Sequence, residues 1–261
     1  TAVMDNIRME KVTVHGNYRV GGLVGEGTGE ILNTNADDIN VTGNYEYIGG
    51  IIGNSNSKLD NINLNNSNIN GQDFVGGIVA YQLGSANKTT KNLTVYNSNI
   101  SGTNNVGGIE GAIASYGSGK HEIYNSTIIG TGDRIGGVVG DNAGGSESNY
   151  RKVVNCEIRG IGANSRTVGG IAGYGHSKIS SSYIQNTKII SNGSCIGGLV
   201  GENDNLSLSV GNNYAVDVKI EGYNNVGGLI GNAKTTISLN FNYLSGTIAG
   251  LNSNVGGLVG T

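Results

Sequence analysis

Residues 20–25 read VGGLVG, and this pattern decides the fold because it returns along the whole chain. It consists of an aliphatic residue, two glycines, a second aliphatic residue, a variable residue and, in all copies but one, a third glycine. Nine copies occur, and their first glycines are spaced by 27–33 residues. A period of this length is typical of a solenoid, a propeller or another repeat array. The glycine pairs are Gly21 and Gly22, Gly49 and Gly50, Gly76 and Gly77, Gly107 and Gly108, Gly136 and Gly137, Gly169 and Gly170, Gly197 and Gly198, Gly227 and Gly228, and Gly256 and Gly257.

Upstream of each pair the chain alternates as a strand does. Several residues before every glycine pair lies an aliphatic residue, Val14 in the first copy. In eight of the nine copies this residue is followed two positions later by a glycine, such as Gly16. Segments such as YAVDVKIEG, residues 214–222, alternate with period 2 and are rich in β-branched residues. Glycine at this density would destabilise a helix by about 1 kcal/mol per position. The aliphatic column consists of Val14, Val41, Ile69, Ile100, Ile128, Ile158, Ile189, Ile220 and Ile248.

We therefore expect an all-β protein, a parallel β-solenoid (β-helix) that occupies residues 1–261 as a single repeat array. It should have about nine coils of about 29 residues, each with three short strands. One strand would carry the aliphatic column, a second the VGGLVG segment, and a third the variable stretch, for example TTISLNF at residues 235–241. Because the chain starts at Thr1 and stops at Thr261 without a distinct capping sequence, we expect it to be a fragment of a larger protein.

Two repeated positions receive structural roles. The paired glycines either adopt a positive φ at a corner or let two walls approach with no Cβ between them. A polar column lies three residues before the aliphatic column, and five consecutive coils carry asparagine there. We interpret these asparagines as a stacked amide ladder that hydrogen-bonds from coil to coil, the alternative being a row of ligand-binding side chains. They are Asn66, Asn97, Asn125, Asn155 and Asn186.

The two cysteines, Cys156 and Cys195, lie at different positions of the repeat in neighbouring coils. A disulfide needs Cα atoms within about 7 Å, so we expect two free thiols. Glu110 stands in a column that is otherwise aliphatic or Ala. A lone buried carboxylate costs several kcal/mol, so we expect a local register shift that turns Glu110 outward and places Ile113 inside. The alternative is a buried pair or a functional carboxylate.

The composition argues against several classes of function. The net charge is −3 and the 16 Lys and Arg residues are scattered, which predicts no nucleic-acid partner. No stretch of 18 apolar residues exists, which predicts no membrane insertion. The segment HEIYN at 121–125 lacks the second histidine of a zinc motif, no CxxC occurs, and no column of the repeat stacks three carboxylates in successive coils. We therefore expect no catalytic residues, no metal and no cofactor.

The longest insertions, at 81–91, 112–120 and 141–152, all follow a glycine motif and should project on one side of coils 3 to 5. If the chain binds a partner, we expect this face to do so. The residues that we assign to it are Tyr81, Tyr116, Tyr150 and Arg151.

The nine glycine-pair segments resemble the GLUG-motif repeat region of bacterial surface and secreted proteins, as in adhesins or the non-catalytic part of IgA-specific metallopeptidases. The resemblance covers the whole chain. It implies an extracellular location, secreted or attached to the cell wall, and partners such as a host glycoprotein, an immunoglobulin, a glycan or other domains of the same chain.

Three functions remain open at this point. The first is a non-catalytic scaffold, spacer or adhesive repeat domain of a surface protein. The second is an accessory, substrate-engaging domain of a secreted IgA-type metallopeptidase. The third, a polysaccharide-active β-helix enzyme, would need converging carboxylates that no column of the repeat supplies.

Overall fold

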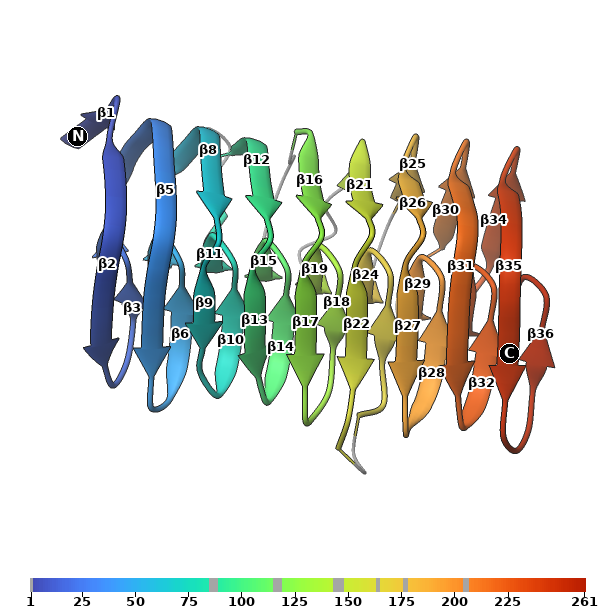
Figure 1. Ribbon diagram of the computed structural model, residues 1–261. Helices are drawn as coiled ribbons and strands as arrows, with labels where there is room; N and C mark the ends of the chain where they lie inside the picture. Colours follow the sequence, from blue (N-terminus) through green and yellow to red (C-terminus); the bar gives the residue numbers. More distant parts are fainter. Residues whose placement is uncertain are drawn as a thin grey trace.

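The computed structural model describes residues 2–84, 89–114, 119–142, 148–162, 165–175, 178–203 and 207–261. The chain winds into a stack of coils that advances along one axis from the N-terminal to the C-terminal end (Figure 1). Every strand pairing in these ranges is parallel, and the strands form four sheets along the axis. The predicted parallel β-solenoid is confirmed. No helix among the described residues is long and apolar enough to cross a membrane.

The main sheet has 15 strands. In most coils it receives two consecutive strands, separated by a bend. Its strands are β1 (Ala2–Asp5), β2 (Arg8–Gly16), β5 (Gly29–Gly43), β8 (Lys58–Asn65), β9 (Asn68–Asn70), β12 (Thr90–Tyr96), β13 (Asn99–Gly102), β16 (His121–Tyr124), β17 (Thr127–Gly130), β21 (Arg151–Val154), β22 (Glu157–Gly160), β26 (Tyr183–Gln185), β27 (Lys188–Ser191), β31 (Tyr214–Gly222) and β35 (Tyr243–Gly250).

The glycine motif supplies two further sheets. Its first half forms the nine-stranded second sheet: β3 (Val20–Gly21), β6 (Glu46–Gly49), β10 (Asp73–Gly76), β14 (Asn104–Gly107), β18 (Ile135–Gly136), β23 (Val168–Gly169), β28 (Ser194–Gly197), β32 (Asn224–Gly227) and β36 (Val255–Gly256). Its second half begins the eight-stranded third sheet: β4 (Val24–Gly27), β7 (Ile52–Ser55), β11 (Val79–Gln82), β15 (Glu110–Ile113), β19 (Val139–Asn142), β24 (Ala172–Gly175), β29 (Val200–Asn203) and β33 (Ile230–Ala233).

A fourth sheet of four strands joins the later coils: β20 (Ser148–Asn149), β25 (Lys178–Ser180), β30 (Leu208–Gly211) and β34 (Ile237–Asn240). The segment expected to form a third strand in the last coils, residues 235–241, contains β34. The coil is nevertheless divided more finely than the three expected strands, because the backbone bends inside the glycine motif and again in the middle of the main sheet.

The register of the coils follows the repeat. The first glycine of each pair lies opposite the first glycine of the next coil, from Gly21 and Gly49 to Gly227 and Gly256. The aliphatic column is likewise continuous from Val14 and Val41 to Ile220 and Ile248. The interior members of this column are almost completely buried, so equivalent side chains form one apolar row along the axis. The repeat is therefore the register of the solenoid itself.

The corners of the coil are turned by residues other than glycine. Twenty-four non-glycine residues have a positive φ, thirteen of them asparagine, whereas Gly246 is the one described glycine with a positive φ. Asparagine tolerates this region better than other side chains, which explains its abundance. The expectation that the paired glycines adopt a positive φ is thus wrong for those positions, and the alternative, close approach of two walls, applies.

The close approach is a backbone contact between successive coils. A Cβ added at Gly137 would overlap the carbonyl oxygen of Gly170 in the next coil and lie 2.8 Å from Ile158 Cδ1. A Cβ added at Gly136 would overlap the carbonyl oxygen of Val139 within the same motif. The first glycine therefore permits the bend, and the second permits stacking.

Two side-chain ladders follow the bend in the main sheet. Asn66 donates to Asp37 at 2.7 Å and Asn186 donates to Asn155 at 3.3 Å, both between coils. Further amide bonds join Asn97 to Asn66 and Asn155 to Asn125. The next residue in each coil is small and hydroxylated in the central coils. Ser98 Oγ, for example, donates to the Tyr96 carbonyl and accepts the backbone N–H of Ser67 at 3.1 Å.

Both cysteines are free and buried, as predicted. Cys156 takes the place of a hydroxyl in the second ladder, where its thiol faces the Val154 carbonyl at 3.3 Å. Cys195 lies at a corner of the coil with a positive φ of 59°. Burial raises the pKa of both thiols to about 11, so neither is a thiolate near neutral pH.

Substituting Gly137 with alanine should lower the free energy of unfolding by about 1–3 kcal/mol, because the new methyl group overlaps the backbone of the next coil. Gly257→Ala is the matched control. It is the second glycine of the last copy, and a Cβ there meets nothing within 4 Å. Urea denaturation followed by circular dichroism measures both. Equal unfolding curves for the two variants would contradict the stacking role of the glycine.

Candidate functional site

The predicted binding face is not assembled as expected. Tyr150 is 62% exposed, but Arg151 is 1% exposed, so Arg151 is wrong as a member of an exposed face. It begins β21 in a column that points into the solenoid, between His121 and the inward Ser182. Tyr81 is half-buried on the third sheet and packs edge-on against Tyr47 and Phe74, with ring centroids 5.6 and 5.5 Å away. Tyr116 lies outside the described residues.

Inside the solenoid, four polar side chains from four strands meet. Glu110 begins β15, Thr90 begins β12, and His121 and Arg151 begin β16 and β21. None is more than 3% exposed. Thr90 Oγ1 lies 2.8 Å from Glu110 Oε1 and 3.1 Å from His121 Nε2, and His121 Nε2 lies 3.5 Å from Glu110 Oε2. Arg151 donates to the Gly119 carbonyl at 2.7 Å. We call Glu110, Thr90, His121 and Arg151 the buried polar cluster.

The position of Glu110 overturns the expected register shift. Glu110 lies opposite Val79 in one neighbouring coil and Val139 in the other, so the third sheet keeps its register there. The carboxylate stays inside because the interior supplies partners from the facing wall. The alternative of a buried pair is the one that the structure bears out. His121 and Arg151 were missed as partners of Glu110 because they share a column with Leu93 and Ser182, and these neighbours gave no sign that the column faces Glu110.

The hydrogen atoms of the cluster allow two arrangements. The Lys120 carbonyl, 2.7 Å from His121 Nδ1, can only accept, so Nδ1 carries a proton. The Thr90 hydroxyl has one hydrogen and faces both Glu110 Oε1 and His121 Nε2. If the hydroxyl donates to Glu110, Nε2 must donate to the hydroxyl, which requires an imidazolium. If the imidazole is neutral, the Thr90 hydroxyl donates its hydrogen to Nε2 and not to Glu110.

Charge decides between the two arrangements. Burial and the positive charge of Arg151 lower the pKa of His121, and the neighbouring Glu110 offsets them only in part. Burial alone would raise the pKa of Glu110, but its charged and polar neighbours in the cluster outweigh burial, so the pKa of this carboxyl is lowered. Burial also lowers the pKa of Arg151 to about 10, which leaves it charged at neutral pH. An ionised Glu110 balanced by Arg151, with a neutral His121, is the arrangement near pH 7.

The cluster does not have the geometry of a hydroxyl nucleophile with its base. In such a triad a carboxylate holds Nδ1 of the histidine, whereas here Nδ1 faces a backbone carbonyl and the carboxylate shares the hydroxyl. Glu110, His121 and Arg151 are at most 1% exposed, so a substrate does not reach them. The cluster therefore acts on stability. Among the described residues, no three His, Cys, Asp or Glu side chains converge in a way that would hold a metal ion.

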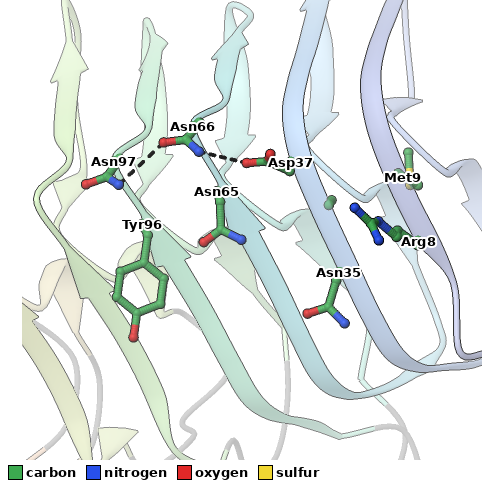
Figure 2. Close-up of a pocket in the computed structure, with 9 residues that line it drawn as sticks. Arg8, Met9, Asn35, Asp37, Asn65, Asn66, Tyr96 and Asn97 are labelled. Atoms are coloured by element: carbon green, nitrogen blue, oxygen red, sulfur yellow. Dashed lines mark hydrogen bonds between the residues drawn. The ribbon is translucent and has the colours of Figure 1, made fainter.

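An open groove lies on the outer face of the main sheet at its bend. Its volume is about 530 Å³, and it crosses β2, β5, β8 and β12, the strands of the first four coils. Figure 2 shows Asn35, Asn65 and Tyr96 projecting from these strands, below the chain of amides that joins Asn97, Asn66 and Asp37. A similar groove of about 300 Å³ follows the same amide column in later coils, along Asn125, Asn155 and Asn186. The first of these we call the amide groove; its lining residues are Arg8, Met9, Asn35, Ala36, Asp37, Asn65, Asn66, Tyr96 and Asn97.

Substituting Glu110 with valine, the residue found on both sides of it, should lower the free energy of unfolding by about 3–5 kcal/mol, because Arg151 keeps its charge in the interior without the carboxylate. The combined variant Glu110→Val, His121→Leu, Arg151→Ser copies the neighbouring residues of each column and should recover most of this loss. Chemical denaturation measures both. A triple variant as unstable as Glu110→Val would show that charge is not the cause.

Acid should destabilise the protein through His121. The folded-state pKa of His121 is lowered, so between its ordinary value near 6.5 and the folded value the unfolded chain binds more protons. The free energy of unfolding therefore falls as the pH falls through this window. Glu110 adds a further loss at lower pH, as the pH falls through its lowered pKa. His121→Gln should flatten the dependence between pH 7 and pH 5, and an unchanged slope would contradict this account.

No protein-family model matches the chain, and no curated protein matches its sequence. Among solved structures, the chain is similar to a Bacteroides ovatus protein provisionally assigned as an immunoglobulin A1 protease. The two share 16% sequence identity with a TM-score of 0.48, and the alignment covers 88% of this chain and 69% of the other.

Proposed function

We propose that the chain is a non-catalytic, rigid scaffold that holds other domains at a fixed distance on the outside of a bacterial cell. The extracellular location and the bacterial source rest on the resemblance to GLUG-motif surface proteins. The mechanical part of the proposal rests on one observation above all: the coils stay in register along the axis, with one local shift between Ala215 and Val218 where β31 pairs with β35.

This continuity is visible in a single outward-facing row of the main sheet. Thr13 lies opposite Asn40 in the next coil, and coil-to-coil pairing continues in register to Lys219 and Thr247. Eight steps of about 4.8 Å give about 38 Å along the axis. Because each step is made by backbone hydrogen bonds and by side-chain ladders, bending the rod would break several contacts at once. A spacer needs this property.

Spin labels at Thr13 and Thr247 test the proposal, since both positions are exposed and belong to the same row. The labels need a cysteine-free background, for which Cys156→Ser and Cys195→Asn copy residues of the same columns. We expect one narrow distance distribution. Deleting residues 197–226, which joins Ile196 to Gly227 and removes one repeat, should shorten the distance by about 4.8 Å and leave it narrow.

A broad distribution in the intact chain would contradict the rigid scaffold. So would a deletion variant that unfolds or keeps the original distance, because a spacer made of equivalent coils should tolerate the loss of one. Incubation with immunoglobulin A and with a panel of polysaccharides tests the non-catalytic part. Cleavage of any of them by the isolated chain would contradict it and would favour the enzymatic alternatives.

A further inference from the structure

The amide groove has the chemistry of a ligand site. Asn66 uses one amide hydrogen to reach Asp37 and accepts a hydrogen bond from Asn97, which leaves one hydrogen and one lone pair unused. The Asn65 side chain makes no hydrogen bond within the described part of the chain, and Figure 2 shows it projecting into the groove beside Tyr96. The groove therefore presents closely spaced donors and acceptors at the surface.

Tyr96 adds an aromatic face at one end of the groove. Its ring stacks on Tyr124 of the next coil, with centroids 4.7 Å apart and planes 7° apart. On the opposite side, the residue in register is Asn65, which is too small to cover the ring. Tyr96 is 36% exposed. One face of the tyrosine is thus used by the stack, and the other borders the amides.

The lining of the groove contains one cation, Arg8, and that cation is already paired. Asp37 accepts a hydrogen bond from Asn66, and Arg8 forms an ion pair with Glu10 at 3.2 Å. The two apolar lining residues, Met9 and Ala36, are buried and form its floor. An anionic ligand therefore finds no unpaired cation among these lining residues, and an apolar ligand finds no pocket. An uncharged, hydroxyl-rich ligand matches the lining best, because each hydroxyl both donates and accepts.

The location of the groove argues against a peptide. A peptide binds to a sheet most readily as an added strand at an edge, where backbone groups are free. The amide groove lies on the face of the main sheet, across β2, β5, β8 and β12, whose backbone groups pair with each other. It runs along the solenoid axis for three coil-to-coil steps, about 14 Å in all. A short chain of sugar rings fits this length and direction.

We propose that the amide groove binds an uncharged oligosaccharide, with Tyr96 stacking on the C–H face of one sugar ring and Asn35, Asn65, Asn66 and Asn97 contacting its hydroxyl groups. This role does not depend on the scaffold function. A rod that binds nothing else and a rod attached to other domains can both carry such a site.

An array of neutral and sialylated oligosaccharides, followed by calorimetric titration of the best neutral glycan, tests this proposal on the whole chain. Tyr96→Ala should weaken binding about tenfold. Asn65→Tyr should abolish it, because a third tyrosine would continue the Tyr96–Tyr124 stack and cover the free face. The matched control is Tyr214→Ala, which removes a 52% exposed tyrosine of the same sheet in a later coil and should leave the affinity unchanged.

Thermal unfolding of each variant separates loss of binding from loss of fold, and Asn65→Tyr decides if Tyr96→Ala is unstable. Three results would overturn the proposal. The first is an array on which no neutral oligosaccharide binds, and the second is binding confined to sialylated glycans. The third is a neutral glycan that binds equally well to the Asn65→Tyr variant, which would place its site elsewhere on the chain.

Discussion

The contact on which the rest of this structure depends is the approach of one coil's backbone to the next at the second glycine of each pair. Any side chain at Gly137 would occupy the space of the Gly170 carbonyl, and the same relation holds from Gly22 and Gly50 onward. Strands of a parallel sheet must stay about 4.8 Å apart everywhere around the coil. A coil that is held away from its neighbour at one corner could not keep this spacing elsewhere. Glycine at this position therefore makes the hydrogen bonds of all four sheets possible.

Polar residues make the remaining bends. Asn66, Asn97 and their equivalents turn the main sheet with a positive φ while their amides join successive coils. The hydroxyl of the serine or threonine that follows donates to the carbonyl of the residue two positions before it, as Ser98 does to Tyr96, and accepts the backbone N–H of the neighbouring coil. A short polar dipeptide thus satisfies the backbone at a bend that would otherwise leave groups unpaired. The same amides leave donors and acceptors at the surface, so the groove at this bend has a polar lining.

The sequence was sufficient to predict the features that recur in every coil. It was not sufficient to predict contacts between residue columns on opposite walls of the interior. The glycine and aliphatic columns, the amide ladder and the free cysteines follow from spacing alone, since each concerns neighbours along one sheet. The corners escaped prediction because Tyr47 and Phe74 occupy a positive φ that only their place in the coil explains. Glu110 was recognised as an exception but placed outside, because nothing in the repeat says that His121 and Arg151 face it from the opposite wall. The amide groove likewise arises from the bend of the main sheet, which the repeat pattern of the sequence does not reveal.

The buried polar cluster has a consequence for how nearly identical coils find their places during folding. Aliphatic columns look alike in every repeat, so a coil that docks one unit too early still buries its valines and isoleucines. Glu110 in such a misaligned chain would be pressed against aliphatic side chains, and Arg151 would lose its carboxylate. Burying these charges without their partners destabilises the misaligned states, whereas the native alignment keeps the charges paired. Glu110 and Arg151, in the middle of the array, thus fix the alignment of their coils where the repeat itself cannot distinguish one coil from the next.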